Sequence, residues 1–194
     1  MHTYQLLLFG HILAAMVWIG GALMMQLFAL RAQASGETGR MAAMAADIEW
    51  IGMRVLTPSS AIVLVLGISL MVKGDWSWDA LWVDVALGLF ATTFALGAGF
   101  FGPESGRIAR LIEAEGGEAP AVLARIRRIL FLARLDLVLL VAIAFVMVTK
   151  PTTDDGGLIL GLLAVAAVAV ALLASRYRRD ESPALPVTEP PPAA

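Results

Sequence analysis

A long uncharged hydrophobic segment near the N-terminus limits the folds open to this chain more than any other feature. The segment runs from Gln5 to Leu30 and contains no Asp, Glu, Lys or Arg. At about 1.5 Å per residue, a helix of this length crosses the roughly 30 Å hydrocarbon core of a bilayer. Inside a bilayer every backbone polar group needs an internal partner, and a helix supplies one for each. The segment therefore predicts a membrane-spanning helix.

The rest of the chain repeats this pattern. Of its 194 residues 59% are hydrophobic, which leaves too little polar surface for an ordinary soluble domain. Four further apolar segments are separated by polar or Gly/Pro-containing turns, and we expect them at Val55–Val72, Ala80–Phe101, Ile129–Thr149 and Gly156–Ser175. The sequence thus predicts an all-α, polytopic transmembrane bundle with a four-helix core and a fifth C-terminal span.

The boundaries between these parts follow from composition. We expect a four-span core domain over residues 1–151 and the fifth helix over 152–175, followed by a disordered cytoplasmic tail over 176–194. The tail is rich in proline and poor in apolar residues, so it cannot bury enough surface to fold. The polar, glycine-containing segment 31–40 is expected to be a loop. Gly102-Pro103 is expected to end the third span.

Basic residues predict the orientation of the chain. One side of the predicted bundle has only Lys73 and Lys150. The loops on the other side, with the segment after the fifth span, contain Arg31, Arg40, Arg54, Arg107, Arg110, Arg125, Arg127, Arg128, Arg176, Arg178 and Arg179. Short loops rich in Arg and Lys stay in the cytoplasm. We therefore predict a multi-pass protein of the cytoplasmic (inner) membrane, with its N-terminus outside and its C-terminus inside.

The chain lacks the residues that several kinds of functional site require. The chain has no cysteine, which excludes disulfides, thiolate metal sites and iron–sulfur clusters. It also lacks a phosphate-cradling glycine loop, a Ser/His/Asp arrangement and a hydrophilic surface for nucleic acid. The expected partners are the lipid bilayer and either a second copy of the chain or a membrane partner subunit. Whether the protein is an enzyme stays open.

His11 is the candidate ligand of the first span. Helical spacing places one face of that span at His11, Ala15, Trp18, Ala22 and Met25. Small residues beside an imidazole and an indole let another helix or a flat ligand approach closely. The alternative is a histidine that only hydrogen-bonds a neighbouring helix. Since the spans hold no second histidine, a haem held by two histidines of one subunit is excluded.

Asp84 has two interpretations. It lies near the outer end of the third span, at about the level of His11, where its carboxylate can hydrogen-bond the imidazole and fix its tautomer. Alternatively it is a hydrated interfacial residue near Trp76, Trp78 and Trp82. We treat His11, Trp18 and Asp84 as candidate cofactor-binding residues, with His11 as the candidate metal ligand.

Arg134 and Asp136 are charged residues of the fourth span. They are two positions apart and point to different sides of a helix, so they cannot pair with each other. Arg134 can extend to the membrane surface, whereas the shorter Asp136 needs a partner from another helix. Arg54 enters the second span from the same side. We expect an ion pair between Arg54 and Asp136, and the alternative is a substrate or proton site.

The order of motifs resembles a known family. The motifs are His11-Ile12 with Trp18, Glu49-Trp50-Ile51-Gly52, Pro58, Gly102-Pro103-Glu104, Arg134-Leu135-Asp136 and Lys150-Pro151. Between about Leu6 and Pro151 they resemble a bacterial family of predicted integral membrane proteins of unknown function, DUF2269. More distantly, the chain is similar to the J-type membrane protoporphyrinogen oxidases and the copper-resistance D proteins.

The distant resemblance implies a cofactor. In those oxidases a histidine of the first span is implicated in haem binding, and His11 occupies the matching position. The chain departs from their pattern at Asp84, near a basic position of the oxidases, and at Arg134-Leu135-Asp136, where they have an Arg-x-x-Asn-like pattern. The resemblance therefore implies the four-helix core and a candidate haem b ligand, but not the oxidase activity. The resulting hypothesis is a membrane protein with a redox-related haem b site, and the alternative is a non-catalytic scaffold or accessory subunit without a cofactor.

Overall fold

The computed structural model describes residues 2–35 and 38–181, which are helical apart from short turns. The α-helices are α1 (His2–Ser35), α2 (Thr38–Ile51), α3 (Thr57–Lys73), α4 (Leu81–Leu96), α5 (Gly102–Glu115), α6 (Pro120–Thr149) and α7 (Gly156–Glu181). Two π-helical segments, η1 (Gly52–Leu56) and η2 (Gly97–Phe101), join α2 to α3 and α4 to α5.

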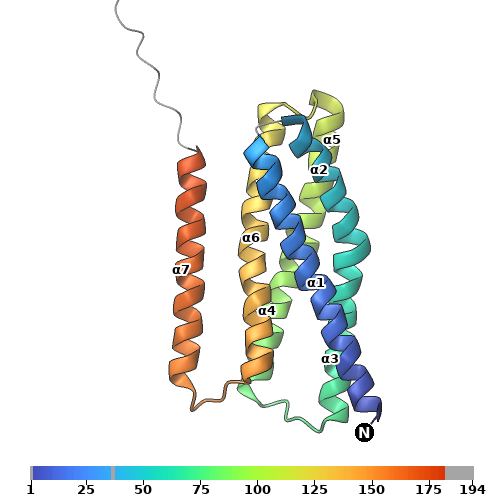
Figure 1. The fold of residues 1–194 in the computed structure, drawn as a ribbon, viewed down its shortest axis with the longest axis vertical. Helices are drawn as coiled ribbons and strands as arrows, with labels where there is room; N and C mark the ends of the chain where they lie inside the picture. Colours follow the sequence, from blue (N-terminus) through green and yellow to red (C-terminus); the bar gives the residue numbers. More distant parts are fainter. Residues whose placement is uncertain (1, 36–37, 182–194) are drawn as a thin grey trace, which may run out of the picture.

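Four helical stretches among the described residues are long and apolar enough to cross a membrane. They are His2–Ser35, Asp47–Lys73, Leu81–Glu115 and Pro120–Thr149. The predicted all-α bundle with a four-helix core is therefore confirmed. At the position of the fifth predicted span the structure has the helix α7, whose apolar part, Ala164–Ser175, is shorter than the four spans. α7 contacts α6 and stands at the edge of the bundle (Figure 1).

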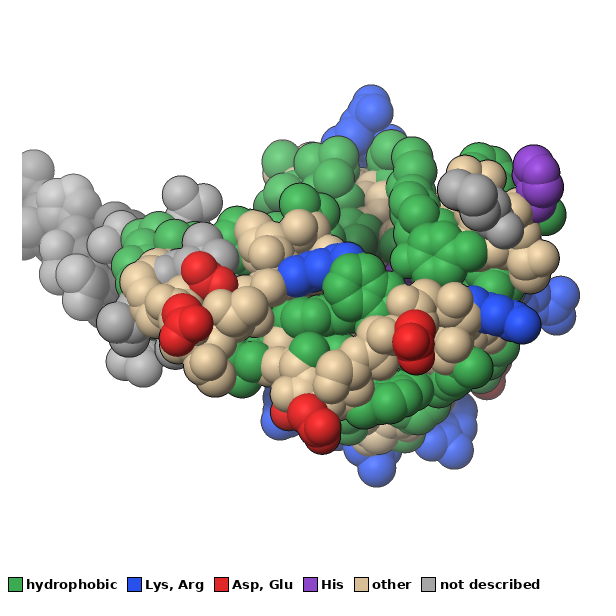
Figure 2. Space-filling view, turned by 90° about the horizontal axis from the view of Figure 1, so that it is seen from below, with side chains coloured by type: hydrophobic (Ala, Val, Ile, Leu, Met, Phe, Trp, Pro, Cys, Tyr) green, Lys and Arg blue, Asp and Glu red, His purple; other side chains and the backbone are tan. Residues whose placement is uncertain are grey.

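The bundle has two chemically different ends. At one end lie the start of α1, the α3–α4 turn with its tryptophans, and the end of α6 (Figure 1). We call this the tryptophan end, and Figure 2 looks onto it: acidic and basic side chains are set among apolar ones. The opposite end holds the α5–α6 turn and the arginines around it, and we call it the arginine end.

Both π-helical segments precede a proline. The N–H of Thr57 bonds to the carbonyl of Gly52, and the N–H of Gly102 bonds to the carbonyl of Gly97. Pro58 and Pro103 follow directly. A proline has no N–H to donate, and its ring crowds the preceding turn. In each case that turn is wider than in an α-helix, with the N–H bonded to the carbonyl five residues earlier, and the helix continues beyond it. The helical stretch therefore continues through Gly102-Pro103, where the sequence predicted the end of the third span, as far as Glu115.

Two other predicted boundaries also change. α1 continues to Ser35 through the first part of the expected loop 31–40, because residues 31–34 include good helix formers and the Ser35 hydroxyl bonds to the Ala32 carbonyl at 2.8 Å. α7 continues to Glu181, so residues 176–181 are helical and are not part of a disordered tail. The remainder of the predicted tail, residues 182–194, lies outside the described residues.

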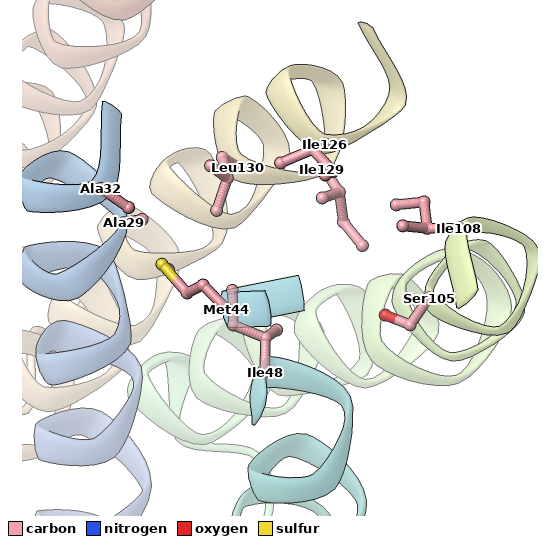
Figure 3. A pocket seen from close by; sticks show the side chains of 9 residues that line it. All are labelled: Ala29, Ala32, Met44, Ile48, Ser105, Ile108, Ile126, Ile129 and Leu130. Atoms are coloured by element: carbon pink, nitrogen blue, oxygen red, sulfur yellow. The ribbon is translucent and has the colours of Figure 1, made fainter. Parts of the chain in front are cut away.

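The arginine end is closely filled. Its buried core consists of Ala29, Ile108, Val122, Ile126, Ile129 and Leu130, drawn from α1, α5 and α6. The cavity among these side chains measures about 20 Å³ (Figure 3), which is room for about one water molecule. Beside it, the buried Glu104 carboxylate binds Arg125 at 2.7 Å and Arg107 at 3.3 Å. This cavity among the described side chains is too small for a cofactor.

Candidate functional site in the tryptophan-end cavity

A much larger cavity opens between the helices toward the tryptophan end. α3 packs on α1 and α4 packs on α6, and all four helices line the cavity. Its volume is about 710 Å³. In the view onto this end the surface is hollowed between two groups of apolar side chains (Figure 2). Lining residues such as Met16, Ile68 and Val148 are largely exposed, so the cavity is also open toward the surrounding lipid.

His11 lies in the wall of this cavity. Its Nδ1 is 2.9 Å from the carbonyl oxygen of Val63 on α3. A carbonyl oxygen only accepts hydrogen bonds, so Nδ1 carries a proton, and in the neutral imidazole Nε2 therefore keeps its lone pair. The ring also lies against Gly67, where an added Cβ would stand 3.2 Å from His11 Cε1. α3 therefore fixes both the tautomer and the position of this imidazole.

Trp18 forms another part of the same wall. Its side chain is buried, and its ring meets the ring of Phe90 on α4 edge to face, with centroids 5.5 Å apart. Ala15 lines the cavity between His11 and Trp18 along α1. These three residues of the predicted face line one side of the cavity, whereas Ala22 and Met25 of that face are not among its lining residues.

The mouth of the cavity holds a lysine among aromatic rings. Lys150 Nζ lies 3.6 Å from the ring centroid of Trp76 and 5.4 Å from that of Trp82. The two indoles meet edge to face at 5.7 Å, and Trp76 Nε1–H donates to the hydroxyl of Tyr4 at 3.4 Å. Sequence reasoning named the Lys150-Pro151 motif and the interfacial tryptophans separately. It missed that the chain brings them together.

The structure does not bring Asp84 to His11. Asp84 lies in the first turn of α4, its side chain is exposed, and it is absent from the cavity wall. A carboxylate there interacts favourably with the helix N-terminus. The Nδ1 partner of His11 is instead the Val63 carbonyl. Asp84 therefore matches the interfacial alternative, and we do not retain it as a cofactor-binding residue.

The predicted ion pair between Arg54 and Asp136 does not form among the described residues. The guanidinium of Arg54 lies 5.7 Å from the ring centroid of Trp50, one turn away on the same helical stretch. Asp136 Oδ1 is buried without a hydrogen-bond partner. Arg134 donates from Nη2 to Gln33 Oε1 at 2.7 Å and so links α6 to α1. The correction has a local cause, because Trp50 competes successfully for the Arg54 side chain.

The fold and the cavity define a class: multi-span, helical integral membrane proteins with a ligand-sized cavity between the spans. Comparison with protein families identifies the family within this class. The chain belongs to the family described as predicted integral membrane protein (DUF2269), whose model matches residues 5–151. That range covers nearly all of the four packed spans and every residue that lines the cavity except Tyr4. Neither the curated proteins nor the solved structures compared with the chain gave a match.

Proposed function

We propose that the cavity binds haem b and that His11 would hold its iron through Nε2. The observation that carries this proposal is the hydrogen bond from His11 Nδ1–H to the carbonyl of Val63, at the wall of the cavity. Metal-ligating histidines commonly donate their second ring nitrogen to a backbone carbonyl or a carboxylate, which fixes the tautomer and raises the basicity of the ligating nitrogen.

The cavity suits such a group in size and lining. Its volume of about 710 Å³ falls within the roughly 300–1,000 Å³ typical of cofactor sites. Aliphatic and aromatic side chains supply most of the wall, including Trp18, Phe90 and Leu140. Flat apolar rings can pack against these surfaces. The distant similarity of His11 to the haem-associated histidine of J-type protoporphyrinogen oxidases supports the same assignment.

The residues of the chain have separate parts in this proposal. His11 would hold the iron, Val63 and Gly67 fix the position of the imidazole, and Trp18 with Phe90 would exclude water from one side of the ligand. When bound, haem supplies one-electron chemistry, and the protein sets its potential through ligation and burial. The proposed role is therefore a redox-related one in the membrane.

The second candidate is a scaffold or accessory subunit without a cofactor. The same hydrogen bond favours it, because His11 and Val63 join α1 to α3 in either case. The two candidate functions differ in the role of the cavity, because only the haem proposal requires a ligand inside it.

A substitution that fills the cavity and leaves His11 unchanged distinguishes the two candidate functions. Ala15 lines the cavity, whereas Ala91 on α4 is exposed and does not. We expect the wild-type protein in detergent to take up one haemin per chain in a spectroscopic titration. Ala15→Phe should abolish saturable uptake, and Ala91→Phe should leave it unchanged. Equal uptake by the two variants would contradict the proposed site.

A further inference from the structure

Lys150 is held at the cavity mouth in an unusual way. It follows the last residue of α6 and has a left-handed backbone with φ of 45°, while its N–H still bonds to the carbonyl of Val146 at 2.8 Å. The chain turns there into Pro151, and the side chain lies across the faces of Trp76 and Trp82. This arrangement keeps the ammonium group at the border of the cavity, which it helps to line.

The charge of Lys150 has no protein counter-charge among the described residues. Five carboxylates lie at the tryptophan end: Asp75, Asp79, Asp84, Asp154 and Asp155. None of them forms an ion pair with Lys150, and Asp155 instead accepts from the N–H and hydroxyl of Thr152. Lys150 also carries the one formal charge among the residues that line the cavity, provided that His11 is neutral.

We infer that Lys150 binds the carboxylate of an amphiphilic ligand whose apolar body occupies the cavity. The cavity wall is apolar and its mouth carries the ammonium group of Lys150. A ligand with an apolar body and a carboxylate at one end therefore complements both parts of the site. An ammonium–carboxylate hydrogen bond gains strength in a partly desolvated site, such as this one beside the rings of Trp76 and Trp82. A haem propionate and a fatty-acid carboxylate share this chemistry. For haem, the inference rests on the proposed function.

Esterified probes test the carboxylate contact. The full-length protein in phosphatidylcholine nanodiscs is titrated with haemin and with haemin dimethyl ester. We expect wild type to prefer haemin by about tenfold, near the low end for a charge-assisted hydrogen bond. Lys150→Met should remove that preference, and Lys150→Arg should keep most of it. Lys73→Met is the matched control, because Lys73 is exposed at the same end and does not line the cavity.

A second probe separates this inference from the haem proposal. Dibromostearate and its methyl ester quench tryptophan fluorescence, and Trp76 and Trp82 lie beside Lys150. If wild type fails to bind haemin yet prefers the free fatty acid in a Lys150-dependent way, the proposed function fails and the inference stands for a fatty acid. If Lys150→Met binds each acid as wild type does, or if wild type binds acids and esters equally, the inference is overturned.

Discussion

The imidazole of His11 rests on the backbone of Gly67, where a Cβ would come within 3.2 Å of Cε1 and 3.6 Å of Nδ1. This contact belongs to the seam between α1 and α3, the most extensive helix pair of the bundle. Small residues at such a seam let the backbones approach closely in a membrane, where dispersion and hydrogen bonds dominate helix association. The same approach gives Val63 its hydrogen bond with His11.

Enlarging residue 67 should therefore disturb the histidine. We expect Gly67→Val to displace the imidazole and to weaken haemin binding by about tenfold or more, with a lower melting temperature from overpacking. The titration used for the cavity measures the first effect. Gly88→Val is the control, since nothing lies within 4 Å of a Cβ at Gly88. Equal affinities of the two variants would contradict the packing role assigned to Gly67.

The sequence predicted the helical class and the His11–Ala15–Trp18 face correctly, because span length and helical period are local properties. It did not predict that the third helix continues beyond Gly102. Pro103 is accommodated by the π-helical turn Gly97–Phe101, and this change involves all five residues of the turn, so Pro103 alone does not indicate it. The partners of Arg54 and Lys150 were also missed. The charge pattern favoured Asp136 as the partner of Arg54, whose guanidinium instead lies over the ring of Trp50, and it indicated no partner for Lys150, whose ammonium group lies over the ring of Trp76.

Glu104 should stabilise the arginine end through its two arginines. Its side chain is 4% exposed and joins α5 to α6 through Arg125. We expect Glu104→Gln to lower the free energy of unfolding by about 1.5–3 kcal/mol, the range for hydrogen bonds to charged groups. Arg125→Gln should cost more than Arg107→Gln, whose contact is longer and whose side chain is 60% exposed. Unfolding in mixed micelles measures these differences, and the reverse order of the two arginines would contradict the assignment.

Asp136 and Arg54 should act independently. Because Asp136 Oδ1 is buried without a hydrogen-bond partner, Asp136→Asn should leave stability unchanged or increase it. Arg54→Gln should lose only its contact with Trp50. In a double-mutant cycle we expect additivity within about 0.5 kcal/mol. A coupling energy well above that value would restore the ion pair predicted from the sequence.

The orientation in the membrane is open to direct labelling. The natural chain has no cysteine, so single cysteines can be introduced without a background. Asp79 at the tryptophan end and Glu115 at the arginine end are both exposed. From the arginine distribution we expect a membrane-impermeant maleimide to label Asp79→Cys in intact cells and Glu115→Cys only after lysis. The opposite pattern would reverse the predicted topology.

The central claim is that His11 ligates haem b in the tryptophan-end cavity. The most direct test is the reduced-minus-oxidised absorption spectrum of the full-length protein, purified from cells with ample haem supply. His2→Ala is the matched control, since His2 is exposed at the start of α1. We predict a haem b difference spectrum in wild type and His2→Ala that is absent from a folded His11→Ala variant. A colourless wild-type protein that also fails to take up added haemin, or an unchanged spectrum in His11→Ala, would contradict the claim.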